Sequence, residues 1–499
     1  MSPTIVSAPG KVLIAGGYLV LDPVYSGLVI STSSRFYTVI ESLGNSPFKV
    51  QVQSPQFLDA IWNYEVNVDV PRGAEVEQAV HDTSEPRSGN KFVHLALQRT
   101  LALILEMEDR KAVRGLLCSG LKITILGGND FYSQRAQLAE RNLPPTIASL
   151  SLVPEFAPSN VTIGNVHKTG LGSSAALITS LVCALLVHFD VIPKSSVTSS
   201  ETVNDGKALV HNLAQYIHCL AQGKVGSGFD VSVAVFGSQI YTRFDPVVLQ
   251  SLMEDSSLTM PLLPIVSPSN TSWTHKVQDF GLPPLTRMML ADVDAGSDTP
   301  SFVGKVLKWV KGSPDEAAEN WTALSKLNQL LGRTLQRLTT LHSNDPQVYE
   351  AVISRCASLT HAEWHSQDSG SQDGAEVIKN LVQVHTITQD IRTKMRQMGE
   401  MSGTPIEPKE QTALLDACVS KAGVLGGGVP GAGGYDAVYV LVLAPPEAGA
   451  QTPADRVEQV WQGWKELDVS PLAAEESREK GVRLEQLSDV KGLKRVLES

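Results

Sequence analysis

The chain has 499 residues, 42% of them hydrophobic and 19% charged, and its formal net charge is -11. This length exceeds what one hydrophobic core usually serves, so we expect an ordinary globular protein with two or three lobes. The acidic balance disfavours nucleic acid and membrane surfaces as partners, and no apolar run reaches the ~20 residues that span a bilayer. The five cysteines are scattered without a C-x-x-C pair, which favours a reducing compartment and predicts a cytoplasmic protein.

Glycines break residues 6–22 into two short apolar runs, which predicts a strand, a tight turn and a second element. Lys11 directly follows a Pro-Gly pair in this stretch. A lysine is usually solvated, and the alternative is a cation aimed at an anionic ligand. Further along, residues 24–42 predict strands, residues 44–90 predict strands with a long surface insertion, and residues 93–107 predict a helix with one apolar stripe.

Residues 121–126 predict another strand, and residues 127–158 have the composition of a long irregular segment. Three polar side chains of that segment are candidates to line a site: Gln134, Arg135 and Arg141. After it, the β-branched residues 161–163 predict a strand, and the apolar run 175–189 predicts a helix.

Glycine and serine dominate the turn between that strand and that helix. Its residues are Lys168, Thr169, Gly170, Leu171, Gly172, Ser173, Ser174, Ala175 and Ala176. Such a turn leaves backbone N–H groups free at a helix N-terminus, where the macrodipole favours an anion. Ser173 or Ser174 can cap the helix or offer a hydroxyl to a phosphate or Mg²⁺. The alternative is an ordinary capped helix, since the Lys-Ser/Thr pair of a P-loop is missing.

Residues 206–222 predict a further helix, which carries His211 and His218 on one face. Neither histidine has a carboxylate or cysteine at ligand spacing, so we expect core histidines rather than a metal site. A second glycine-rich turn follows and ends on Asp230, which is either a turn cap or a functional carboxylate. Alternating side chains predict a strand at 231–235.

The boundary between two lobes is expected in the Pro- and Ser-rich residues 245–284. The second half opens with a strand at 288–291 and a polar turn at 294–300, and the helices after it carry Leu and Met stripes typical of a core. A third glycine-rich stretch, 426–436, leads into a strand at 437–443. Glycine lets the backbone pass close to a ligand. A flexible linker is the alternative, although a buried strand does not normally follow a linker at once.

Together and in this order, the glycine stretches at 9–11, 168–176 and 431–436 resemble the three motifs of the GHMP small-molecule kinases. That superfamily includes galactokinase, homoserine kinase, mevalonate kinase and phosphomevalonate kinase. Residues 8–22 are similar to the opening of fungal-type phosphomevalonate kinases, where Gly-Gly-Tyr replaces the Gly-Glu-His of mevalonate kinase. The same family is matched by Pro405, Ile406, Glu407 and Pro408.

The resemblance implies a two-lobed α+β fold. Residues 1–270 would form an ATP-binding lobe of the ribosomal-protein-S5 type with an insertion at about 44–90, and residues 281–499 a helix-rich, ferredoxin-like lobe. The implied reaction is ATP-dependent phosphorylation of 5-phosphomevalonate to 5-diphosphomevalonate in the mevalonate pathway of isoprenoid and sterol biosynthesis. The implied partners are this substrate, ATP and Mg²⁺, and the assembly is expected to be a monomer or a homodimer.

The resemblance also implies roles for single residues. Lys11 would reach between the donor and acceptor phosphates, and Asp230 would orient Lys11 or hold Mg²⁺ through water. Residues 168–176 would cradle the ATP phosphates, with Ser174 touching Mg²⁺. Mevalonate kinase has a glutamate Mg²⁺ ligand shortly before its aspartate, whereas residues 218–229 contain no acidic residue here. The residues expected to contact the substrate are Lys11, Tyr18, Lys224, Ser227, Gly296, Ser297, Thr299 and Gly433.

The chemistry of the acceptor bears on these roles. A phosphate monoester has a second pKa near ~6, so its oxygen is largely ionised at neutral pH and needs a general base much less than an alcohol does. Catalysis would then consist mostly of positioning and charge neutralisation. Two alternatives stay open: another GHMP kinase such as mevalonate kinase, and a non-catalytic metabolite sensor on the same fold.

Overall fold

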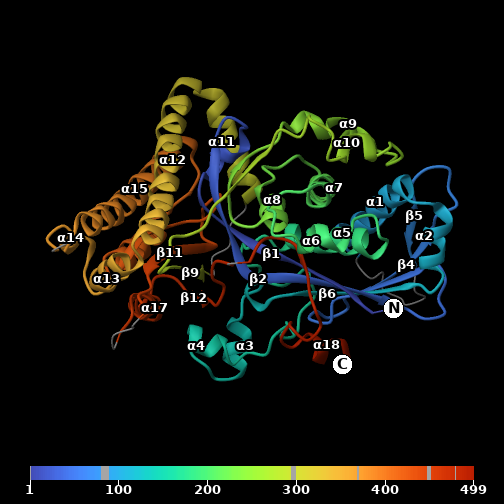
Figure 1. Ribbon diagram of the computed structural model, residues 1–499, viewed down its shortest axis with the longest axis horizontal. Coiled ribbons are helices and arrows are strands. Elements are labelled where there is room, and N and C mark those ends of the chain that lie inside the picture. Colours follow the sequence, from blue (N-terminus) through green and yellow to red (C-terminus); the bar gives the residue numbers. More distant parts are fainter. Residues whose placement is uncertain are drawn as a thin grey trace.

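Two β-sheets organise the chain, one in each lobe (Figure 1). The computed structural model describes residues 2–79, 89–293, 299–367, 370–446, 451–477 and 479–498. Within these ranges the larger sheet has nine strands in the order β13-β1-β2-β6-β3-β4-β5, with β7 beside β2 and β8 beside β7. Its strands are β1 (Thr4–Ala15), β2 (Ser26–Ser42), β3 (Lys49–Gln53), β4 (Ile61–Asn67), β5 (Glu75–Gln78), β6 (Leu121–Gly127), β7 (Gln239–Thr242), β8 (Lys276–Asp279) and β13 (Arg483–Leu484).

Apolar helices cover one face of this sheet (Figure 1). The central one, α5, is apolar on nearly all sides because it packs on β1 and β2 and also contacts α1, α7 and α8. The main helices of this layer are α1 (Lys91–Met107), α5 (Ser173–His188), α7 (Asp205–Gln222) and α8 (Phe229–Phe236). The short ones of this lobe are η1 (Gly17–Leu21), α2 (Arg110–Leu117), η2 (Asn129–Phe131), α3 (Arg135–Glu140), α4 (Ile147–Leu150), α6 (Lys194–Thr198), η3 (Pro246–Leu249), α9 (Gln250–Glu254) and α10 (Leu263–Val266).

The second lobe packs helices against a four-stranded sheet of order β10-β11-β9-β12. Its longest helices, α12 and α15, lie side by side (Figure 1). Of the leucine stripe predicted on α12, Leu324, Leu331, Leu335 and Leu338 are buried and Leu327 is half-buried. The strands are β9 (Thr286–Val293), β10 (Val424–Gly428), β11 (Ala437–Leu443) and β12 (Val469–Leu472). The helices are α11 (Thr299–Gly312), α12 (Pro314–Asn344), α13 (Pro346–Cys356), α14 (His361–Trp364), α15 (Gln372–Ser402), α16 (Lys409–Val419) and α17 (Pro453–Gly463).

The tail of the chain returns to the first lobe. β13 pairs with β1 through Val6 and Leu484, and α18 (Leu493–Glu498) packs beside Ile5 and Val39. The two marked chain ends accordingly lie near each other in Figure 1. The expectation that 281–499 forms the second lobe is therefore wrong for this tail, because its edge strand and apolar side chains find their partners on the first sheet. The lobe boundary near residue 280 stays a prediction.

Two predicted strands are wrong. Residues 231–235 belong to helix α8, and all five are buried, so the sequence alternation did not correspond to one buried and one exposed face. Residues 161–163 make one isolated bridge, between Thr162 and Leu58, and otherwise no strand within the described residues. β-branched side chains favour strands only where a neighbouring ladder exists. The segment predicted to carry a surface insertion contributes β3, β4 and β5 to the sheet.

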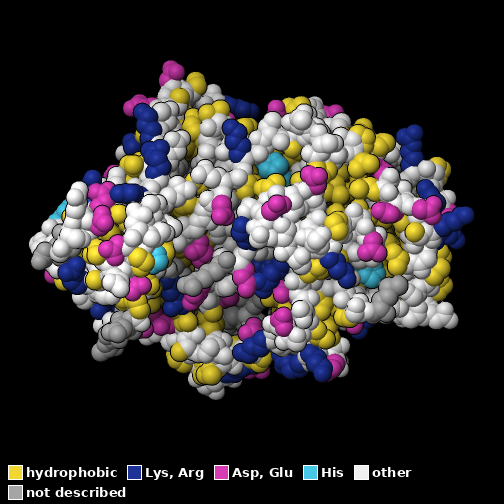
Figure 2. Space-filling model, viewed as in Figure 1, with side chains coloured by type: hydrophobic (Ala, Val, Ile, Leu, Met, Phe, Trp, Pro, Cys, Tyr) yellow, Lys and Arg dark blue, Asp and Glu magenta, His cyan; other side chains and the backbone are white. Residues whose placement is uncertain are grey.

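On the face shown in Figure 2, basic and acidic side chains are interspersed, with no broad area of one sign. No helix in the part of the chain that the structure describes is long and apolar enough to cross a membrane.

Candidate active site

The glycine-rich turn at 168–176 leads into α5 as predicted, but neither serine caps the helix. The N-cap is Gly172, with a left-handed φ of 80°, and no side chain among the described residues caps it. The first N–H groups of α5 therefore remain available to an anion. Gly170 is also left-handed, with φ of 77°. A Cβ on Gly172 would lie 2.9 Å from Lys11 Cγ, whereas one on Gly170 would meet no described atom within 4 Å.

Lys11 lies against this turn rather than in solvent. Its backbone N–H donates to the carbonyl of Leu171 (2.9 Å), and its Nζ donates to the carbonyl of Gly170 (2.8 Å). The ammonium also lies 5.5 Å from the centre of the Phe229 ring. Burial lowers the pKa of Lys11, and the carboxylates of Asp230 and Asp436 oppose that shift. Lys11 therefore contacts the glycine-rich turn and lines a cavity, and its catalytic role stays a prediction.

Asp230 and Ser174 meet at a histidine that the sequence analysis assigned to the core. His218 Nε2 lies 3.0 Å from Ser174 Oγ and 3.8 Å from Asp230 Oδ2. His218 is buried, as expected, but it lies between two predicted site residues. Its signal in the sequence was its position one turn before the Gln222 end of α7, which leads into the turn that ends on Asp230.

This arrangement offers few metal ligands. No group of three or more His, Cys, Asp or Glu side chains that could hold a metal ion occurs among the described residues. A hydroxyl from Ser174 and a carboxylate from Asp230 are oxygen donors of the kind Mg²⁺ prefers. They fit a Mg²⁺ that takes most of its remaining ligands from nucleotide phosphates and water, as the missing acidic residue before Asp230 indicated.

An inter-lobe cavity of ≈ 190 Å³ lies beside Lys11. Of the residues predicted to contact the substrate, Lys11, Tyr18, Ser227 and Gly433 line it, and Asp436 is a lining carboxylate that the sequence analysis missed. The Tyr18 hydroxyl donates to the carbonyl of Ala432 (2.7 Å), so η1 of the first lobe holds the third glycine stretch. The signal for Asp436 was its position directly after the glycines of that stretch.

The other predicted substrate residues have different outcomes. Lys224 is exposed and is not among the described residues that line the inter-lobe cavity. Gly296 and Ser297 lie outside the described residues. Thr299 is the first residue of α11, whose Val303 lines the cavity.

A larger, mostly apolar cavity of ≈ 830 Å³ lies on the other side of the glycine-rich turn. Lys168, Ser173 and Ser174 line it, whereas Thr169, Gly170 and Leu171 line the inter-lobe cavity. The turn at 168–176 therefore separates the two cavities. Aromatic side chains that the sequence analysis did not single out make up much of the apolar wall: Phe57, Trp62, Phe92 and Tyr132.

The three candidates in the irregular segment 127–158 have local or inter-lobe contacts, and none is among the described residues lining either cavity. Gln134 donates to the carbonyls of Asn129 and Tyr132, and Arg141 donates to Gln137. Arg135 contacts the buried Asp292 of β9 and so joins the lobes. Their expected role as site residues is not supported.

Comparisons with known proteins agree with this geometry. Residues 378–467 match the family model described as "GHMP kinases C terminal". The chain is 38% identical to "Phosphomevalonate kinase, peroxisomal" of Arabidopsis thaliana, covering 95% of this chain and 94% of the relative. It is 35% identical to a phosphomevalonate kinase of Aspergillus fumigatus, covering 89% and 88%, and 33% identical to one of Candida albicans, covering 88% and 89%.

Solved structures share the fold. A Listeria innocua protein, Lin0012, superposes with a TM-score of 0.60 at 14% identity, covering 97% of this chain and all of that one. A Streptococcus pneumoniae phosphomevalonate kinase in complex with phosphomevalonate and AMPPNP gives 0.54 at 16% identity, covering 95% and 99%. At these identities the likeness concerns the fold alone. With the relatives that exceed 30% identity over most of both chains, the findings lead to one conclusion: this chain belongs to the phosphomevalonate kinase family of the GHMP kinases.

Proposed function

We propose that the chain transfers the γ-phosphoryl group of ATP to the phosphate of 5-phosphomevalonate, which yields 5-diphosphomevalonate and ADP in the mevalonate pathway. The observation that carries this proposal is the turn at 168–176, which separates a large cavity with an aromatic wall from a small cavity lined by Lys11 and Asp436, with Lys11 against the turn. Such an arrangement suits a donor nucleotide on one side and a small anionic acceptor on the other.

The nucleotide is assigned to the apolar cavity. Its aromatic wall suits a purine base, and Lys168 lines the same cavity. The phosphates would then run along the uncapped N-terminus of α5, where free N–H groups and the helix macrodipole favour negative charge. Left-handed Gly170 and Gly172 give the turn the shape that leaves these groups exposed.

The acceptor is assigned to the inter-lobe cavity. An oxygen of its phosphate bonds to the γ-phosphorus while the bond from that phosphorus to the β–γ bridging oxygen breaks, and ADP leaves. Lys11 neutralises the charge of the two phosphates as they approach. Because the acceptor oxygen is already ionised, Asp230 needs to take no proton. In this proposal Asp230 keeps Lys11 protonated, which agrees with its opposing effect on the Lys11 pKa.

Mg²⁺ is assigned to Ser174 and Asp230 together with the nucleotide. When bound, it would supply further charge neutralisation on the donor phosphates. His218, 3.0 Å from the Ser174 hydroxyl, would orient that hydroxyl. We expect that chelation of Mg²⁺ stops turnover and that Ser174→Ala raises the Mg²⁺ concentration needed for half-maximal rate. A metal titration of both proteins measures this.

The direct test offers ATP with either 5-phosphomevalonate or mevalonate to the purified chain. We expect ADP release with 5-phosphomevalonate and a diphosphate signal in the ³¹P NMR spectrum of the product. A preference for mevalonate would support the rival kinase and overturn the proposal. Nucleotide and acceptor binding without any ADP release would support the metabolite sensor instead.

The proposal for the compartment comes from the scattered cysteines, and the proposal for the assembly comes from the family. We propose a cytoplasmic monomer or homodimer, although the Arabidopsis thaliana relative is named peroxisomal. Imaging of the tagged chain in its own cells tests the compartment, and light scattering after size exclusion tests the assembly.

A further inference from the structure

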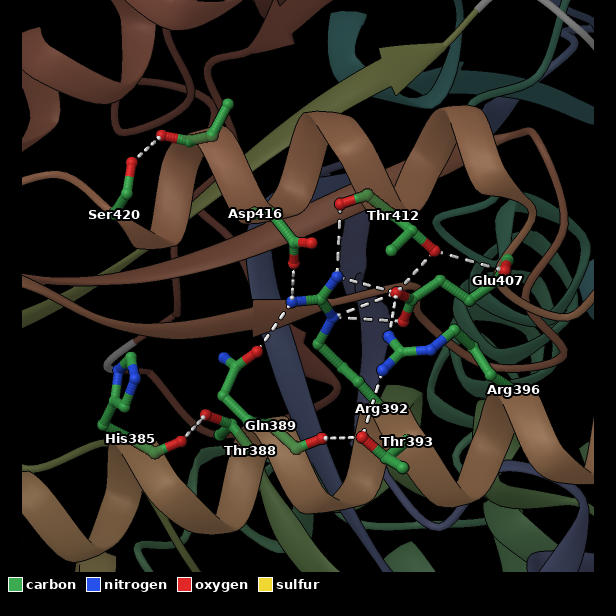
Figure 3. Close-up of polar contacts among 11 residues, drawn as sticks. His385, Thr388, Gln389, Arg392, Thr393, Arg396, Glu407, Thr412, Asp416 and Ser420 are labelled. Carbon is green, nitrogen blue, oxygen red and sulfur yellow. Dashed lines mark hydrogen bonds and ion pairs between the residues drawn. The ribbon is translucent and has the colours of Figure 1, made fainter.

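We infer that a charge cluster built around the buried Arg392–Glu407 pair of the second lobe positions the glycine stretch 431–436 and thereby sets the acceptor side of the inter-lobe cavity. The charge cluster comprises Arg392, Arg396, Glu407, Thr412 and Asp416 (Figure 3). The inference depends on the proposed placement of the acceptor in that cavity.

Glu407 lies at the centre of the charge cluster (Figure 3). Its side chain is 0% exposed, and Oε1 accepts from Arg392 Nη2 (2.7 Å), Arg396 Nη1 (2.8 Å) and Thr412 Oγ1 (3.1 Å). Arg392 Nε adds contacts of 3.1 Å and 3.2 Å to the two carboxylate oxygens. A buried carboxylate with this many donors has one well-defined position, because moving it away from Arg392 leaves charge unpaired in the interior.

Arg392 fixes the helices on either side of Glu407. Its Nη1 contacts Asp416 Oδ1 on α16 (2.8 Å) and donates to Gln389 Oε1 on its own helix, α15 (2.7 Å). The short segment 403–408 connects α15 and α16 and carries Glu407. The guanidinium therefore holds both ends of that segment.

The residue before Glu407 contacts the glycine stretch. Ile406 is buried, and its carbonyl accepts from the N–H of Gly434 (2.8 Å). A Cβ on Gly433 would lie 2.1 Å from that same carbonyl oxygen, so the two backbones touch where only glycine fits. A displacement of Glu407 would move Ile406 and, through this contact, Gly433 and Gly434.

The glycine stretch forms one wall of the inter-lobe cavity, through Gly431, Gly433 and Asp436. On its other side the first lobe holds it, because Gly431 N–H donates to Leu13 O (3.2 Å) and Tyr18 holds Ala432. The charge cluster is thus the second-lobe half of a two-sided clamp on this wall. The glycine turn at 168–176 is outside that clamp.

Stability alone is a poor explanation for such a cluster. Buried ion pairs cost desolvation energy, and well-packed apolar side chains often replace them without loss of stability. The cluster does, however, fix the position of the segment 403–408, because hydrogen bonds are directional and apolar packing is not. This makes Glu407 and Arg392 positioning residues, which act on the acceptor through Ile406 and the glycine stretch.

A graded series of variants tests the inference: Thr412→Val, Arg396→Met and Glu407→Gln. We expect the KM for 5-phosphomevalonate to rise by about threefold in the mildest variant and about tenfold or more in Glu407→Gln, while the KM for ATP stays within about twofold. Hydrogen–deuterium exchange should become faster in peptides covering 403–408 and 431–436, and stay unchanged at 168–176.

The matched control is Glu485→Gln, which breaks another buried ion pair. Arg35 of β2 and Glu485, directly after β13, lie 3.8 Å apart with side chains 3% and 6% exposed, and neither is among the described residues that line the two cavities. This variant should lower the melting temperature and leave both KM values unchanged. The control therefore distinguishes a general loss of protein stability from a displacement of the glycine stretch 431–436.

The outcomes divide cleanly. If the series lowers stability but leaves the acceptor KM unchanged, or raises both KM values together, the inference is wrong. Gly433→Ala, a change in the cavity wall itself, then shows whether the error lies in the role of the charge cluster or in the placement of the acceptor. A raised acceptor KM in Gly433→Ala would leave the cavity assignment intact, whereas an unchanged KM would overturn the acceptor placement as well. If Glu407→Gln does not fold, the two milder variants decide, because they keep the Arg392–Glu407 pair.

Discussion

The two glycine stretches around the inter-lobe cavity are held in different ways. The turn at 168–176 opens α5 and takes its shape mainly from its own left-handed Gly170 and Gly172, to which Lys11 adds hydrogen bonds at the carbonyls of Gly170 and Leu171. The stretch 431–436 depends on distant segments, namely Leu13, Tyr18 and Ile406. A turn shaped mainly by its own residues can be recognised from a sequence motif, and one substitution within the motif can disrupt it. A loop that is positioned by distant segments can also be displaced by substitutions far away in the sequence.

Lys11 is where the two regions meet, so its loss should have the largest effect. Lys11→Met keeps most of the side-chain volume but removes the cation that lies 2.8 Å from the Gly170 carbonyl. We expect kcat to fall by about 10²–10³-fold, the range seen when one preorganised electrostatic group is removed, with a smaller change in the KM for ATP. Steady-state kinetics measures both, and retention of more than a tenth of the turnover would contradict the role given to Lys11.

The next prediction tests whether the turn at 168–176 acts on catalysis through its contact with Lys11. Gly172→Ala and Gly170→Ala both place a side chain at positive φ, which should cost about 1 kcal/mol of stability each. Only Gly172→Ala also pushes against Lys11, at 2.9 Å from its Cγ. We therefore expect similar melting temperatures but about tenfold lower kcat in Gly172→Ala alone. Equal turnover in the two variants would show that the Lys11 contact is unimportant.

The two carboxylates near Lys11 allow a comparison of the donor and acceptor sides. Asp230 and Asp436 both raise the Lys11 pKa against the lowering effect of burial, so Asp230→Asn and Asp436→Asn should each lower it further. Because Lys11 must be protonated to act, the alkaline limb of the kcat profile should move to lower pH in both variants.

The size of the Asp230→Asn effect also separates the rival kinases. We expect less than about 10²-fold loss at neutral pH, whereas a general base for an alcohol contributes about 10²–10⁴-fold. A loss at the upper end of that range would favour an alcohol acceptor. Asp436→Asn should instead act mainly on the KM for 5-phosphomevalonate, since Asp436 lines the inter-lobe cavity.

The smallest effect on turnover is expected from a substitution at Asp130, which lies outside both glycine stretches. Its Oδ1 accepts from Ala473 N–H of the tail (2.7 Å), and burial raises its pKa to about 6. The folded protein then binds more protons than the unfolded chain between about pH 4 and pH 6, so stability falls as pH rises through that window. Melting temperatures of Asp130→Asn should lack this fall, and the turnover of the variant at neutral pH should match that of the parent. An identical pH dependence of the melting temperature in the variant and the parent would contradict this role of Asp130.

Some of this architecture was determined by the sequence alone. The leucine stripe of α12, the turn at 168–176 and the lysine after Pro9 and Gly10 are local patterns, and local geometry makes them visible. The order of the glycine stretches then identified the family. The contact of Lys11 with the turn at 168–176 agrees with its position in that motif, although lysine as a residue type is usually solvated.

Other features were decided only by the tertiary structure. Residues 231–235 form part of helix α8, which the sequence could not show because all five are buried and a segment without an exposed face has no readable period. The contact of His218 with Ser174, the return of β13 to β1 and the hold of Ile406 on Gly434 join residues far apart in the chain. Such pairings depend on which surfaces meet after folding, and no single stretch of sequence contains both partners.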